Sequence, residues 1–188
     1  MAGSADASGL PGRLWRYAAT GLAAGALVGL VLSVYHVALL DTDLTGAAAV
    51  ALQDLAISAV FLGLTGAIVG GFAALLAGAA ATVSLRRRSS RLQEALAAGI
   101  CLLGSLTVIA VAGPSEIEIA IVDRPIIAAS LALTAAFLGA RAAGIRPSIT
   151  LYAQLLIAAL PASAAIGTML RLMGMGRLPE GLTGAMPA

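Results

Sequence analysis

The chain has 188 residues, of which 60% are hydrophobic and only 11% are charged, and its formal net charge at pH 7 is +2. Soluble domains carry about 45–50% apolar and about 25% charged residues. A water-soluble fold of this size cannot bury so much apolar surface. The composition therefore excludes an ordinary soluble protein and indicates an integral membrane protein, as does the mean hydropathy of +1.01.

Residues suited to metal or redox chemistry are scarce. The chain has one cysteine, Cys101, and one histidine, His36. A single cysteine excludes an intramolecular disulfide and a cysteine-based zinc or iron–sulfur cage, and a single histidine excludes a bis-histidine haem site within one subunit. The small positive charge comes from loops, so we do not expect nucleic-acid binding.

The chain is expected to begin with a flexible cytoplasmic tail, residues 1–12, which is rich in Gly, Ser and Ala. The first membrane span is predicted over residues 14–40. The apolar run that follows Arg13 and Arg16 is longer than the roughly 7–15 residues of a signal-peptide hydrophobic region, so we expect a helix that the mature protein retains.

Four further apolar runs follow in chain order. The second is long and uncharged, and the third follows Ser90 and Gln93, whose spacing fits a capping box. Pro125 precedes the fourth run and suits a first helical turn. The fifth run contains Pro161, which membrane helices tolerate. These four spans are predicted over residues 55–85, 95–112, 126–143 and 149–170.

The predicted fold class is all-α: a polytopic transmembrane helical bundle with five spans. Residues 13–170 form a single domain in this interpretation, and residues 171–188 form a C-terminal tail. The alternative has four spans plus a re-entrant or interfacial C-terminal segment. It arises because a fifth span places Arg171 and Arg177 on the side of the membrane opposite to the other arginines.

One connecting segment, GPSEIEIAIVDRP at residues 113–125, has the alternation of a β-strand. Isoleucines at positions 117, 119 and 121 alternate with Glu116 and Glu118, which is the two-residue period of a strand. A lone strand cannot satisfy its backbone inside lipid. We therefore expect either a short extended ribbon at the outer membrane surface or an ordinary connecting loop.

Charges sort between alternate connections. One set of connections carries the arginines Arg13, Arg16, Arg86, Arg87, Arg88, Arg91, Arg141 and Arg146. The other set carries the carboxylates Asp41, Asp43, Asp54, Glu116, Glu118 and Asp123, with Arg124 as its only base. Cytoplasmic loops favour basic residues, so this pattern predicts a cytoplasmic N-terminus. Abundant Ala, Gly and Arg without any Lys indicate a GC-rich bacterial genome, and hence a multi-pass protein of the bacterial plasma (inner) membrane.

Small residues recur at four-residue spacing on three of the predicted helices. In lipid, such rows let helix backbones approach closely. We therefore predict helix-packing faces, either within this chain or against another protein. The rows are Gly21, Gly25 and Gly29; Gly66 and Gly70; and Ala136, Ala140 and Gly144.

Two charge clusters suggest contacts at the membrane surfaces. Arg86, Arg87, Arg88 and Arg91 are predicted to contact anionic lipid head groups or an acidic partner, the alternative being a simple topological anchor. The six outer carboxylates are predicted to form a cation-attracting vestibule. The alternative is that they lie outside only as a consequence of the topology.

No catalytic grouping, metal-protease motif or phosphate loop is present, and we predict that the protein is not an enzyme. The predicted function is a non-catalytic accessory, scaffold or assembly subunit of a larger membrane complex, with membrane lipids and other membrane-protein subunits as partners. The alternative is a small transporter or channel subunit with an acidic extracytoplasmic mouth. A third interpretation is a haem or quinone anchor that uses His36 as a ligand, although no cofactor is predicted.

Overall fold

The computed structural model describes residues 10–40, 48–111, 120–145 and 148–173, and this part of the chain is helical without strands. The helices are α1 (Leu10–Leu40), α2 (Ala48–Ser84), α3 (Ser90–Val111), α4 (Ala120–Ala142) and α5 (Ile149–Leu172). All five are long and apolar enough to cross a membrane. The all-α bundle with five candidate spans is therefore confirmed, and α5 continues through Pro161 as one helix.

The predicted ribbon between the third and fourth spans is wrong where the structure describes it. Residues 120–125 form the start of α4, whereas residues 113–119 lie outside the described residues. Pro125 is consequently the sixth residue of the helix, where its nitrogen cannot donate to the carbonyl of Ile121. A helix satisfies most of its backbone groups internally, while a single strand leaves both of its edges unpaired.

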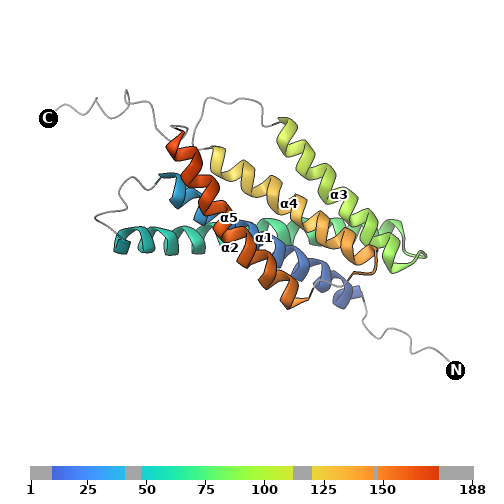
Figure 1. Cartoon of the computed structure of the whole chain (residues 1–188). Helices are drawn as coiled ribbons and strands as arrows, with labels where there is room; N and C mark the ends of the chain where they lie inside the picture. The colour runs from blue at the N-terminus through green and yellow to red at the C-terminus, as the bar shows by residue number, and fades with distance from the viewer. Residues whose placement is uncertain (1–9, 41–47, 112–119, 146–147, 174–188) are drawn as a thin grey trace.

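Helix α1 packs against α2, α4 and α5, and its most extensive contact is with α2 (Figure 1). Helices α3 and α4 pack on each other, and both contact α2. A buried cluster joins α1, α2, α3 and α4. It consists of Tyr17, Ala77, Ala81, Ala97, Cys101, Ala135 and Leu138.

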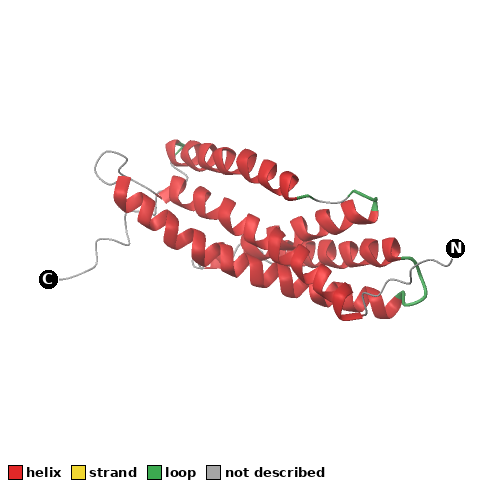
Figure 2. Cartoon of the chain, turned by 90° about the horizontal axis from the view of Figure 1, so that it is seen from below, coloured by secondary structure: helices red, strands yellow, loops and turns green. Residues whose placement is uncertain are grey.

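Helix α5 lies at one side of the bundle, as the two perpendicular views show (Figures 1 and 2). Among the described helices, only α1 packs closely along it. A further contact joins α5 to α4: the ring of Tyr152 meets the ring of Phe137 edge to face, with centroids 4.8 Å apart. Most of the outward surface of α5 is therefore uncovered within this chain.

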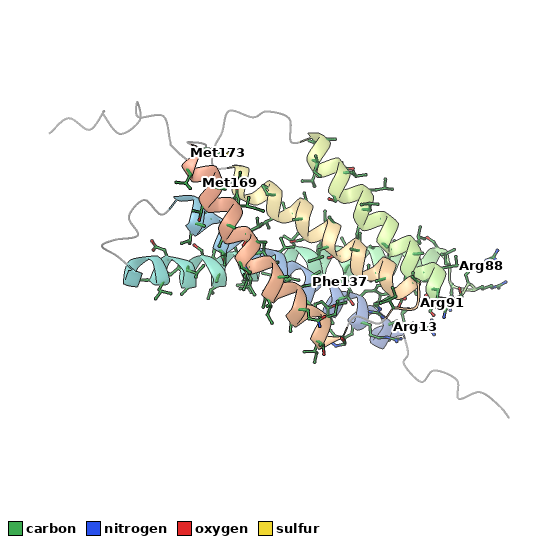
Figure 3. The ribbon with its side chains drawn as sticks, viewed as in Figure 1. Arg13, Arg88, Arg91, Phe137, Met169 and Met173 are labelled. Carbon is green, nitrogen blue, oxygen red and sulfur yellow. The ribbon has the colours of Figure 1, made fainter. Side chains whose placement is uncertain are left out.

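Basic residues gather where α1 and α3 begin and where α2 and α4 end. Figure 3 shows Arg13, Arg88 and Arg91 at this end of the bundle, opposite to Met169 and Met173. We call it the arginine end. It comprises Arg13, Arg16, Arg86, Arg87, Arg88, Arg91 and Arg141.

Candidate functional sites: an arginine-lined pocket and the outer face of α5

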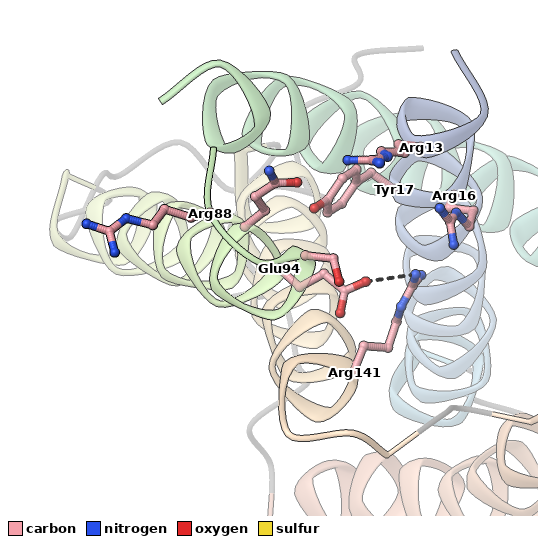
Figure 4. A pocket seen from close by; sticks show the side chains of 8 residues that line it. Arg13, Arg16, Tyr17, Arg88, Glu94 and Arg141 are labelled. Carbon is pink, nitrogen blue, oxygen red and sulfur yellow. Dashed lines mark hydrogen bonds and ion pairs between the residues drawn. The ribbon is translucent and has the colours of Figure 1, made fainter. Parts of the chain in front are cut away.

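A pocket of about 300 Å³ opens at the arginine end (Figure 4). Helix α1, the α2–α3 connection, and helices α3 and α4 all contribute to its wall. Four of the lining side chains are cationic and one is acidic. The lining residues are Arg13, Arg16, Tyr17, Arg88, Ser90, Gln93, Glu94 and Arg141.

Arg141 ties three helices together in the pocket wall. Its Nη2 donates to Oε1 of Glu94 at 3.0 Å, and its Nη1 donates to Oγ1 of Thr20 at 2.8 Å. The Arg141 and Glu94 side chains are only 20% and 17% exposed. A charge withdrawn from water needs a partner, and the carboxylate of Glu94 supplies one. The pair therefore fixes α4 against α1 and α3.

Gln93 stabilises the tight connection between α2 and α3. Its side chain is 2% exposed, and its Nε2 donates to the carbonyl of Leu85 at 2.9 Å. Helix α3 begins at Ser90, as the motif predicts, but the backbone N–H of Gln93 bonds to the carbonyl of Ser89, and the reciprocal bonds of a capping box do not form between Ser90 and Gln93. This orientation places Glu94, the next residue, toward Arg141.

The four arginines of the predicted cluster are only partly shared with the pocket. Arg86, Arg87, Arg88 and Arg91 are all exposed, and only Arg88 lines the pocket. The guanidinium of Arg88 is directed away from the pair formed by Glu94 and Arg141 (Figure 4). The other arginines of the pocket come from the start of α1 and the end of α4, which are far apart in the sequence.

The glycine rows of α1 and α2 face each other. A Cβ added at Gly25 would overlap the carbonyl of Gly66, and one added at Gly21 would overlap the carbonyl of Gly70. A Cβ at Gly29 would meet the carbonyl of Leu62 in the same way. These rows therefore pack within the chain, and backbone lies directly on backbone along this seam.

The row predicted on α4 does not pack within the described chain. Ala136 and Gly144 are exposed, and Ala140 is only half-buried. Gly144 lies beyond the helix at a φ of 89°, and the amide of Ile145 bonds back to the carbonyl of Ala140. Gly144 thus terminates α4 in the left-handed conformation that glycine favours. The buried row of α4 is Ile126, Ser130, Thr134 and Leu138.

Of the predicted vestibule and cofactor ligand, the structure describes the side chains of Asp54 and His36, and both lie away from the arginine end. Asp54 is exposed near the start of α2, and His36 is half-buried near the end of α1. The side chains of Asp41, Asp43, Glu116, Glu118 and Asp123 lie outside the described residues. In the part of the chain that the structure describes, no three His, Cys, Asp or Glu side chains come together as metal ligands.

A second candidate site, which sequence spacing had not singled out, is the outer face of α5. It consists of Thr150, Gln154, Ala158, Pro161, Ala165 and Thr168, all exposed. Their spacings of three and four residues place them on one side of a helix. The buried residues Ser163 and Gly167 lie on the opposite side. These small and polar residues could have been found from their spacing in the sequence. Only the exposure of their side chains in the structure shows that they face outward.

No protein-family model, curated protein or solved structure matches this chain. Its function is therefore inferred from the two sites described above.

Proposed function

We propose that the protein is a non-catalytic accessory subunit of a larger complex in a bacterial plasma membrane, and that it joins its partner through the outer face of α5. The observation that carries this proposal is the composition of that face. Apart from Ile157, which is 73% exposed beside them, its members are small or polar, although they lie on a helix apolar enough to span a membrane.

The exposed side of α3 carries more large apolar side chains than the outer face of α5 does, although α5 also exposes Ile157 and Ile166. On α3 the exposed large side chains include Leu102, Leu103, Leu106 and Ile109. Lipid tails solvate such side chains well. Small side chains instead let a second helix approach closely, and in lipid that close packing drives association. The contrast between the two helices supports a protein partner for α5.

Gln154 adds a polar reason for a partner. Its side chain is exposed on α5, and among the described residues its amide makes no hydrogen bond. An amide without a partner in an apolar environment costs free energy, whereas an amide bonded to a neighbouring helix contributes about 0.6–2 kcal/mol. The amide therefore favours the same association as the small residues around it.

Pro161 provides a third group suited to a partner. It is exposed in the middle of α5, and its nitrogen cannot donate to the carbonyl of Ile157. That carbonyl keeps acceptor capacity on the outward side of the helix. A partner that offers a hydroxyl or amide donor would satisfy it, as neighbouring helices do at other proline positions in membranes.

The orientation belongs to the same proposal. Arginine-rich ends of membrane helices favour the cytoplasmic side. We place the arginine end in the cytoplasm, so that the N-terminus is cytoplasmic and the fifth span ends on the outer side. The outer face of α5 then runs through the bilayer, where an integral membrane partner can cover it.

The test is capture of the partner from native membranes in mild detergent. Ala158→Ile places a branched side chain in the proposed interface and is expected to reduce the recovered partner about tenfold, the effect of some 1.4 kcal/mol. Ala110→Ile makes the same change at an exposed position of α3 and is expected to leave recovery unchanged. Gln154→Leu should weaken recovery without adding bulk.

Equal recovery with Ala158→Ile and with the unmodified protein would show that this face is not the interface. Loss with Ala110→Ile to the same degree would show a general effect on the bundle. Recovery of nothing but further copies of this chain would contradict an accessory role in a complex of different subunits.

A further inference from the structure

We infer that the arginine-lined pocket is a binding site for a phosphate group, presented by an anionic phospholipid head group or by a soluble phosphate compound. The site lies on α1, α3 and α4 and does not use the outer face of α5. The proposed phosphate site therefore does not depend on the proposed interface of α5.

The charge of the pocket favours an anion. Four arginines and one glutamate line it, and the guanidinium groups of Arg13, Arg16 and Arg141 lie nearest its space, whereas that of Arg88 is directed away. The carboxylate of Glu94 is already bonded to Arg141 at 3.0 Å. Gathering like charges at one site is unfavourable, and a bound anion relieves the repulsion.

The geometry of the cations suits an anion with several oxygen atoms. Figure 4 shows Arg13 and Arg16 projecting from α1, and Arg141 reaching from α4, around the same space. Hydrogen bonds to Glu94 and Thr20 hold the guanidinium of Arg141 in place before any ligand arrives. Preorganised guanidinium groups bind phosphate through paired N–H donors.

Two hydroxyl groups strengthen the preference for phosphate. Tyr17 lines the pocket from α1, and Ser90 lines it at the start of α3. Each hydroxyl offers a donor beside the guanidinium groups. A carboxylate has only two oxygens, whereas a phosphate group has enough acceptor oxygens to satisfy donors from α1, α3 and α4 together.

The position of the pocket brings it to the level of lipid phosphates. It opens where the apolar part of α1 begins and where α4 ends, at one end of three candidate spans. Basic pockets between membrane helices bind lipid head groups in this position. A volume of about 300 Å³ accommodates a phosphate with a small head group but leaves acyl chains outside.

The experiment measures ligand binding by the purified, delipidated full chain in a neutral detergent. The probes are phosphatidylglycerol, phosphatidylcholine and inorganic phosphate, the last matched against chloride at equal ionic strength. Saturable binding of phosphatidylglycerol alone identifies a lipid site. Saturable binding of inorganic phosphate, which also competes with the lipid, identifies a site for a soluble phosphate compound.

Two variants separate the pocket from general surface charge. The double variant Arg13→Gln/Arg16→Gln removes two pocket cations and is expected to weaken binding of the probe at least about tenfold. The double variant Arg86→Gln/Arg87→Gln removes the same charge from the same end, outside the pocket lining, and is expected to bind within about twofold of the unmodified protein.

Equal weakening by both double variants would overturn the proposal, because the effect would then be surface charge. Absence of saturable binding by every probe would overturn it as well. The single variant Arg16→Gln is a milder test than the double variant, because it changes one exposed side chain. It is expected to weaken binding about threefold, and unchanged binding in a well-folded Arg16→Gln protein would count against the site.

Discussion

Gly25 shows at the scale of one residue why α1 carries glycine where it meets α2. The position of its missing Cβ is occupied by the carbonyl of Gly66, which is backbone and cannot rotate away. Gly66 meets the backbone of Gly25 in the same way, so neither helix has room for a side chain. Van der Waals contact between the two backbones depends on both glycines.

Gly25→Ala is therefore expected to lower the free energy of unfolding by about 1–3 kcal/mol, the usual cost of forcing atoms into a packed site. Reversible unfolding in mixed detergent micelles measures this change. Gly99→Ala is the matched control, because a Cβ at Gly99 meets no atom within 4 Å. Equal destabilisation by the two substitutions would show that the seam between α1 and α2 is not tightly packed.

Residue spacing predicted which faces carry small side chains but not what those faces meet. The rows of α1 and α2 pack on each other, while Ala136 and Gly144 on the third row are exposed. Spacing is a property of one helix, whereas contact depends on the rotation of two helices about their axes. Gly144 terminates α4 just beyond the predicted fourth span, and a terminating glycine and a packing glycine look the same in a sequence.

At the scale of helices, a hydrogen bond joins α3 to α4 inside the bundle. The hydroxyl of Ser105 donates to the carbonyl of Ala128 at 2.8 Å, and Ser105 is 3% exposed. The hydroxyl of Thr107 differs, since it donates within its own helix to the carbonyl of Leu103. The two residues lie two positions apart on α3. Comparing substitutions at the two positions therefore distinguishes a hydrogen bond between helices from one within a single helix.

Ser105→Ala is expected to destabilise the protein by about 0.5–1.5 kcal/mol, because it removes a bond between helices and leaves the carbonyl of Ala128 with one partner fewer. Thr107→Ala is expected to change stability by less than about 0.5 kcal/mol, since the residue is exposed and its bond is local. Unfolding midpoints of both variants in the same micelles give the comparison. A larger loss for Thr107→Ala would contradict the assigned role of Ser105.

The helices themselves were readable from apolar runs because lipid demands about 20 apolar residues for each crossing. Most of the pocket was not readable, because its contacts join distant parts of the chain. Arg141 bonds Glu94, 47 positions away, and Thr20, 121 positions away. The one local indication was Glu94, a single acidic residue close to several arginines. Its partner Arg141 lies at the end of α4, which the sequence around Glu94 does not reveal.

At the scale of the whole molecule, we propose different contacts for the charged end and the uncovered side. In this proposal the pocket of the arginine end faces one membrane surface, while the outer face of α5 runs along the bilayer. The glycine seam between α1 and α2 and the buried cluster among the first four helices hold this arrangement together. Neither proposed contact requires that bundle to rearrange.

The orientation of the bundle predicts which positions a membrane-impermeant maleimide reaches in intact cells. Cys101 is 2% exposed, so the unmodified protein is expected to label weakly and serves as the background. Met173 lies at the end opposite to the arginines (Figure 3), and Asp54 lies near the start of α2, away from the arginine end where α2 finishes. Met173→Cys and Asp54→Cys are therefore expected to label from outside. Arg87→Cys is expected to label only after the cells are permeabilised, because basic helix ends remain in the cytoplasm.

Labelling of Arg87→Cys in intact cells would show that the orientation is the reverse of the proposed one. Labelling of Met173→Cys only together with Arg87→Cys would show that α5 returns to the cytoplasmic side, and the outer face of α5 would then not cross the bilayer.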